Sequence, residues 1–115
     1  MSQREGLGFS LVVRFELLAG HDDAFDALAA ETVAAIRSSE PGTLAYVVHR
    51  ESDSPRTRVF YELYRDSEAF EEHERMPHVR RFLTERGQHL TSDPEVWWVT
   101  PFDGVVRPEA DPGGG

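Results

Sequence analysis

The sequence predicts an α+β fold in which four strands form one antiparallel sheet and the helices lie on one of its faces. Two periodicities in the 115 residues support this prediction. Apolar residues alternate with polar ones in the first segment, as in a half-buried strand, and recur at helical spacing in the second. The predicted order is strand, helix, strand, strand, helix, helix, strand, which is the order of a ferredoxin-like domain.

The first strand is predicted over residues 8–17, and the first helix follows a turn at Gly20. Asp22 or Asp23 is expected to cap this helix, which runs to about Ser39, because aspartate side chains accept hydrogen bonds from the free amides of a first turn. The apolar stripe of the helix repeats every three or four residues and comprises Phe25, Leu28, Ala29, Thr32, Val33 and Ile36.

A predicted hairpin follows the first helix. Pro41-Gly42 ends the helix, and the second strand is predicted from residue 44 to 51. A cluster of turn-forming residues at 52–55 separates it from the third strand, predicted over 57–65. Because the connection is short, the two strands are expected to pair with each other.

Two further helices are predicted over residues 67–75 and 78–90, on either side of Pro77. Asp66 precedes the first of them in the position of an N-cap. The turn that follows the second contains Pro94 and leads into the last strand, predicted over residues 95–102. Proline breaks the helical pattern because it lacks a backbone N–H and clashes with the preceding turn.

The chain is expected to form one domain, since its length suits a single hydrophobic core. The domain is predicted to cover residues 8–102, with a flexible leader at 1–7 and a flexible tail at 103–115 that is rich in proline and glycine. No apolar run is long enough to span a bilayer, and no signal-like segment opens the chain.

The composition excludes several kinds of partner and cofactor. The formal net charge is −9, whereas nucleic acids and anionic membranes require a basic surface. The absence of cysteine excludes disulfides and thiolate chemistry, and a reducing cytoplasm is the expected location. All 12 basic residues are arginine, so no lysine can form a Schiff base. Because nucleotide-binding and metal-binding motifs are also missing, no cofactor or metal is expected.

The third and last strands have bulky apolar residues on both faces, including the run Val96-Trp97-Trp98-Val99. Helices can cover only one face of such a sheet. A second copy of the sheet is therefore expected to cover the other face, which would give a homodimer with a barrel-like core, a dimeric α+β barrel. A monomer would leave this apolar surface in water.

His73 is the leading candidate for a functional residue. It follows Phe70 by three residues, so it lies on the apolar side of its helix and faces the sheet. Glu62 lies between Phe60 and Leu63 in an apolar strand, where a buried carboxylate needs a partner. The alternatives remain that His73 is a core histidine satisfied by one hydrogen bond, and that Glu62 is exposed or paired with an arginine.

The roles of the tyrosines and of a second histidine are less specific. Tyr46 and Tyr64 could pack within the sheet or act as proton donors. His78 follows His73 by five residues across Pro77, so the two histidines are not expected to share one helical face.

Three motifs carry a family resemblance: Glu40-Pro41-Gly42, Tyr61-Glu62-x-Tyr64 and Ala69-Phe70-x-x-His73-x-x-x-Pro77-His78. Together with the element order over residues 8–102, they resemble the antibiotic biosynthesis monooxygenase (ABM) family of small dimeric α+β-barrel proteins, in its quinol-oxidising and isomerase-like branch. Heme-degrading members have an asparagine, a tryptophan and a histidine where this chain has Val13, His73 and Leu83. The resemblance therefore does not imply a heme.

The resemblance implies one cavity between the sheet and the helices. The residues expected to face it are Val13, Phe60, Glu62, Tyr64, Phe70 and His73, and the further substrate-binding candidates are Tyr46, Phe82 and Trp98.

The leading hypothesis is a cofactor-independent monooxygenase that acts with dioxygen on a small aromatic, phenolic or quinol substrate. His73 would remove a phenolic proton, and Glu62 would orient the imidazole and stabilise its charged form. Tyr64 and Tyr46 would hydrogen-bond a substrate oxygen. Two alternatives stay open: an isomerase or tautomerase that uses the same base, and a non-catalytic dimeric ligand-binding or stress-related protein.

Overall fold

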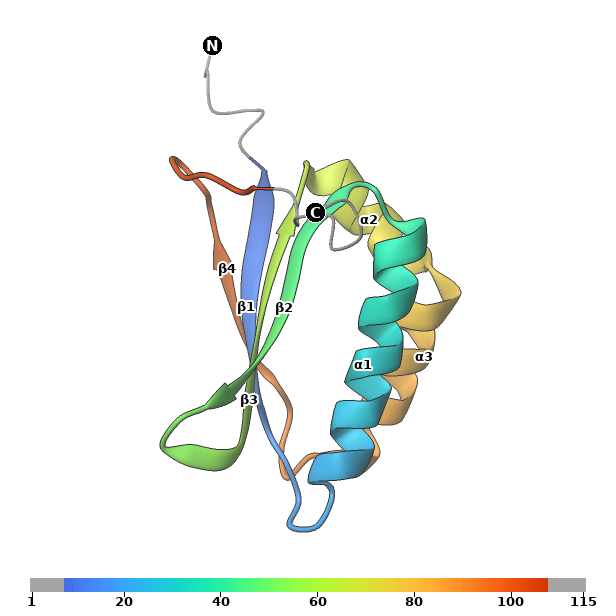
Figure 1. Ribbon diagram of the computed structural model, residues 1–115, viewed down its shortest axis with the longest axis vertical. Helices are drawn as coiled ribbons and strands as arrows, with labels where there is room; N and C mark the ends of the chain where they lie inside the picture. Colours follow the sequence, from blue (N-terminus) through green and yellow to red (C-terminus); the bar gives the residue numbers. More distant parts are fainter. Residues whose placement is uncertain (1–7, 108–115) are drawn as a thin grey trace, which may run out of the picture.

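The computed structural model describes residues 8–107, so the predicted leader and the end of the predicted tail lie outside the described residues. Four antiparallel strands form one sheet in the order β2-β3-β1-β4 (Figure 1). The strands are β1 Phe9–Glu16, β2 Thr43–Glu51, β3 Ser54–Tyr64 and β4 Glu95–Val99. The α+β, ferredoxin-like fold predicted from the sequence is confirmed.

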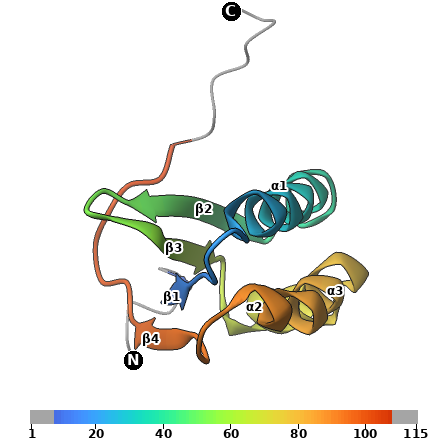
Figure 2. The ribbon, with the colours of Figure 1, turned by 90° about the horizontal axis from the view of Figure 1, so that it is seen from below.

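The helices lie together on one face of the sheet (Figure 2). They are α1 Asp22–Ser39, α2 Ser67–Arg75 and α3 Pro77–Glu85, followed by the short 3-10 helix η1 Arg86–His89. The α-helix predicted over 78–90 is thus shorter than expected. Gly87 weakens an α-helix at this point, and Leu90 leaves it to form a β-bridge with Leu17.

Of the two N-caps predicted from the sequence, the one at α2 is confirmed and the one at α1 is wrong. Asp66 caps α2, because its Oδ1 accepts a hydrogen bond from the backbone N–H of Ala69 at 2.8 Å. The prediction that Asp22 or Asp23 caps α1 is wrong: the N-cap is His21, whose side chain makes no capping hydrogen bond. Both aspartates lie in the first turn of α1, where negative charge still favours the helix dipole.

The core between the sheet and the helices is largely aromatic. Phe15 of β1 contacts Phe60 of β3 at a ring-centroid distance of 4.7 Å and Phe25 of α1 at 5.4 Å. Phe82 of α3 stacks on Phe60 at 5.7 Å. All residues of the predicted apolar stripe of α1 are buried except Val33, which is half-buried. This packing fixes α1 and α3 on the sheet.

Among the described residues, no helix covers the other face of the sheet, and apolar side chains are exposed there. Val47 of β2 is 45% exposed and Trp97 of β4 is 48% exposed. β4 ends at Val99, before the predicted bound at residue 102, and Pro101 has no backbone N–H with which to extend the pairing. The segment after β4 continues on this side of the sheet (Figure 2).

Candidate active site

A cavity of about 300 Å³ lies between the helix-covered face of the sheet and helices α2 and α3. Strand register builds the sheet side of its wall. Leu11 of β1 pairs with Glu62 of β3, and Glu62 pairs in turn with Tyr46 of β2. Directly paired residues project to the same face of a sheet, so three neighbouring strands contribute adjacent side chains to the cavity.

Most of the site residues expected from the sequence meet at this cavity. Those that line it are Val13, Tyr46, Glu62, Phe70, His73, Phe82 and Trp98. Phe60 and Tyr64 are buried behind the wall instead. Phe60 packs on Tyr46 at a ring-centroid distance of 5.7 Å, and Tyr64 packs on His73 at 5.0 Å. They support lining residues rather than contact the cavity themselves.

His73 is oriented by Glu40. Its Nδ1 lies 2.7 Å from Oε1 of Glu40, and both side chains are almost fully buried. The imidazole also packs against the ring of Tyr46 at a centroid distance of 5.6 Å. Because Nδ1 is engaged by the carboxylate, Nε2 is the nitrogen left to contact a ligand in the cavity.

Glu40 binds three side chains at once. Besides His73, its Oε1 accepts a hydrogen bond from Thr43 Oγ1 at 2.7 Å, and its Oε2 bonds to Nε2 of His78. Burial raises the pKa of Glu40, but the hydrogen bonds from His73, Thr43 and His78 outweigh burial and hold that pKa below its usual value. An ionised Glu40 can accept a hydrogen bond from each of the two imidazoles at the same time.

Glu62 does not have the partner expected from the sequence. It accepts a hydrogen bond from the hydroxyl of Tyr64 at 2.5 Å, whereas the carboxylate bonded to His73 is that of Glu40. Burial raises the pKa of Glu62. This effect is larger than the lowering of the pKa by the Tyr64 hydrogen bond and by the charge of His73. Glu62 is therefore a buried carboxyl that keeps its proton more readily than an exposed one.

His78 reaches the same carboxylate as His73 from a different helix. The sequence separates the two histidines across Pro77, and they lie on two helices, because α2 ends at Arg75 and Pro77 begins α3. Both imidazoles nevertheless contact Glu40. The side chain of His78 is 17% exposed and that of His73 is 4% exposed, so the His78 contact lies nearer the surface.

Glu40 and Arg86 were not expected at the site, although the sequence contains a signal for each. Glu40 follows Ile36 by four residues and so continues the buried stripe of α1. Arg86 follows Phe82 by four residues and lines the cavity beside it. In both cases the signal is a charged residue at a position that continues the apolar side of a helix.

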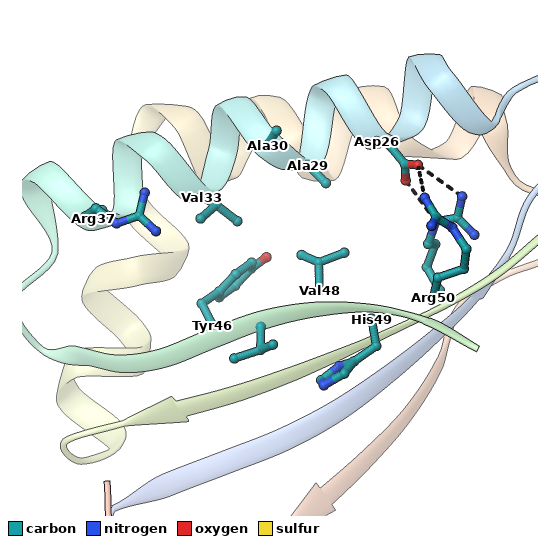
Figure 3. Close-up of a pocket in the computed structure, with 11 residues that line it drawn as sticks. Asp26, Ala29, Ala30, Val33, Arg37, Tyr46, Val48, His49 and Arg50 are labelled. Carbon is teal, nitrogen blue, oxygen red and sulfur yellow. Dashed lines mark hydrogen bonds and ion pairs between the residues drawn. The ribbon is translucent and has the colours of Figure 1, made fainter. Parts of the chain in front are cut away.

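A wider hollow of about 700 Å³ lies between α1 and the edge strand β2 (Figure 3). At one end, Asp26 of α1 pairs with Arg58 at 2.8 Å and with Arg50 at 3.5 Å. Tyr46 borders both hollows. The charged side chains at this end of the wider hollow are already paired with one another. The smaller cavity at His73 is therefore the candidate site.

Within residues 8–107, no three histidine, aspartate or glutamate side chains are arranged to hold a metal ion. Glu40 lies between His73 and His78 as a hydrogen-bond partner of both. No helix in this part of the chain is long and apolar enough to cross a membrane.

The fold and the cavity define a small α+β domain with a buried histidine–carboxylate pair beside an apolar pocket. Residues 8–85 match the family described as antibiotic biosynthesis monooxygenase (ABM). The chain belongs to this family, as the resemblance implied. A search of the curated proteins finds no match.

Solved structures with the same fold come from several bacteria. Rv0793 from Mycobacterium tuberculosis is 26% identical, with a TM-score of 0.78 over 84% of this chain and 97% of that protein. PA3566 from Pseudomonas aeruginosa is 23% identical, with a TM-score of 0.74 over 84% and 95%. A Caulobacter crescentus protein named for the ABM family is 17% identical, with a TM-score of 0.81 over 87% and 93%.

Proposed function

We propose that the protein is a cofactor-independent monooxygenase of small phenols or hydroquinones. Membership of the ABM family supports an oxygenase. The observation that carries the proposal is the position of His73, which lines an apolar cavity while Glu40 engages its Nδ1. A histidine held in this way has the geometry of a general base, because the carboxylate stabilises the imidazolium that forms.

In the proposed reaction, the aromatic ring of the substrate lies among the apolar side chains of the cavity, such as Phe70 and Phe82. His73 Nε2 accepts the phenolic proton, and Glu40 stabilises the resulting charge through Nδ1–H. The phenolate is electron-rich and transfers one electron to dioxygen. The two radicals then combine to form a carbon–oxygen bond, and the resulting peroxide anion takes the proton back from His73 to become a hydroperoxide.

Loss of water from the hydroperoxide completes the reaction. The carbon keeps one oxygen atom as a carbonyl, and the other oxygen leaves as water with two hydrogens from the substrate. His73 takes the proton from the carbon that bears the hydroperoxide and passes it to the departing oxygen, so that the histidine ends neutral. Phenol and dioxygen thus become quinone and water without an external electron donor.

An isomerase or tautomerase is the second candidate function. The observation that favours it is that two proton-transfer groups line the same cavity, His73 and Glu62. Burial raises the pKa of Glu62. A neutral carboxyl opposite a basic imidazole could donate one proton while the other group accepts one, which is the requirement of a keto–enol shift.

Oxygen uptake with a panel of phenols and hydroquinones tests the proposal. We expect oxygen consumption by the purified protein and incorporation of one atom of labelled dioxygen into the product. His73→Ala should lower the rate by about a hundredfold or more, since a general base typically contributes that much. Glu72→Gln, an exposed change next to His73 on α2, is the control and should leave the rate unchanged.

Two results would contradict the proposal. One is a His73→Ala protein that folds, by circular dichroism, and consumes oxygen as fast as the wild type. The other is no oxygen uptake with any member of the panel, while exchange of substrate protons with deuterated water is accelerated. The second result would favour the isomerase.

A further inference from the structure

Arg86 is a half-buried cation on the wall of the candidate cavity. It is the first residue of η1, and its guanidinium lies over the rings of Phe15 and Phe82 at 5.5 and 5.8 Å from their centroids. Within residues 8–107, its side chain forms no hydrogen bond and no ion pair. By contrast, the buried Arg58 donates three hydrogen bonds to Asp26 and Pro55.

A cation in such a position needs compensation, because removal of a charge from water is costly unless the charge is paired. Burial lowers the pKa of Arg86, and the nearby Tyr46, Glu62 and Glu74 partly offset this effect. The two phenylalanine rings stabilise the guanidinium by cation–π attraction. This attraction does not use up the N–H donors as a hydrogen bond would, so they stay available to a ligand.

The neighbouring carboxylates do not accept hydrogen bonds from these N–H donors. Glu62 accepts a hydrogen bond from Tyr64, and burial raises its pKa, so it loses its charge more readily than an exposed carboxyl does. Glu74 is exposed at the border of the cavity, where water screens its charge. Neither glutamate forms an ion pair with Arg86 among the described residues.

We propose that the cavity selects aromatic ligands that carry an anionic oxygen, a carboxylate or an ionised phenol, and that Arg86 binds this oxygen. The inference rests on the proposed function, in that both require the cavity to hold an aromatic ligand. A guanidinium matches a carboxylate through two parallel hydrogen bonds and binds a single oxyanion through one or two. The apolar side chains around it would hold the ring.

Binding of a matched pair of ligands tests this proposal without turnover. Isothermal titration under nitrogen would compare 1-naphthoate, which is anionic at neutral pH, with 1-naphthol, which is neutral. We expect the wild type to prefer 1-naphthoate. Arg86→Met keeps the apolar stem over Phe15 and Phe82, and should weaken 1-naphthoate binding by about tenfold or more while 1-naphthol binding changes little.

Two further variants complete the design. Arg86→Lys keeps the charge without the planar fork, so we expect it to retain part of the preference for 1-naphthoate. Arg80→Met removes the same charge from an exposed position on α3 and should bind both ligands as the wild type does. Titration with 4-nitrophenol below and above its ionisation distinguishes the two sources of the anion: tighter binding of the ionised form, lost in Arg86→Met, indicates a phenolate.

The proposal is overturned if Arg86→Met weakens both naphthalene ligands equally, since Arg86 would then act through packing alone. It is also overturned if the wild type prefers 1-naphthol or binds none of the anions. Failure of the oxygenase proposal gives a different result, in which 1-naphthoate binding depends on Arg86 but no phenol supports oxygen uptake.

Discussion

Glu40 is the residue on which the proposed chemistry of His73 depends. Its carboxylate bonds both histidines and Thr43, and these hydrogen bonds hold its pKa below the usual value despite burial. It is therefore ionised at neutral pH, when His73 would have to accept a proton. A neutral group of the same shape could still orient the imidazole but could not stabilise its positive charge.

Glu40→Gln separates these two roles. We expect the rate of oxygen uptake to fall by roughly a hundredfold, since the amide keeps a hydrogen bond but loses the charge that stabilises the imidazolium. Measurement of the rate against pH would show the loss across the whole neutral range. Equal rates for Glu40→Gln and the exposed control Glu72→Gln would assign Glu40 a structural role only.

Ionisation of Glu62, in contrast to that of Glu40, is expected to destabilise the fold. Its pKa in the folded state is raised above the unfolded value, mainly by burial, so folding favours its neutral form. Ionisation therefore destabilises the fold as the pH rises from the unfolded pKa to the folded pKa, and the full cost remains above the latter. Below the unfolded pKa the cost is absent.

Glu62→Gln should accordingly raise the free energy of unfolding more at about pH 8 than at about pH 4. The glutamine oxygen can still accept the hydrogen bond from Tyr64, so the change removes the titration and little else. Urea unfolding of both proteins at the two pH values measures the difference. A gain that is equal at both pH values would show that ionisation of Glu62 costs nothing.

The sequence predicted the residues of the site better than their pairing. Strand alternation placed Glu62 on the helix-covered face, and helical spacing placed His73 opposite the sheet. The contact between Glu40 and His73 joins positions 33 residues apart, and no periodicity encodes it. It depends on how the turn between α1 and β2 lies against α2, which is a tertiary property.

At the scale of elements, the site depends on α2, which has only 9 residues. Helices of this length are unstable alone and depend on packing and on their caps. Local sequence predicted its bounds, because Asp66 supplies an N-cap and Pro77 cannot continue a helix from the preceding turn. The end of α3 was harder to predict, since its transition to η1 coincides with the non-local bridge between Leu17 and Leu90.

Asp66→Ala tests the contribution of the cap to this element. It removes the acceptor for the Ala69 N–H, and we expect the thermal midpoint to fall by roughly 4 °C. Asp66→Asn keeps an oxygen acceptor and should lie close to the wild type. Thermal unfolding followed by circular dichroism measures both. If the two variants have the same midpoint, the side-chain hydrogen bond does not stabilise α2.

At the scale of the whole molecule, the uncovered face of the sheet is the main unexplained surface. Val47, Trp97 and Val99 are each between 43% and 48% exposed, and they come from both edges of the sheet. Val105, in the segment that continues on this side, is 73% exposed. Several large apolar side chains exposed on one face are typical of a protein–protein interface.

We therefore expect a homodimer joined through this face, as the apolar pattern of the strands and the ABM resemblance suggested. Light scattering should give twice the mass of the 13.0 kDa chain at micromolar concentration. Obligate interfaces usually bury about 2,000 Å² or more and exclude charge from their centre. Trp97→Glu should therefore shift the protein towards the monomer, whereas Glu72→Arg, on the exposed side of α2, should not. A wild-type monomer at these concentrations would contradict the prediction, because Trp97 would then be exposed for a reason other than dimer formation.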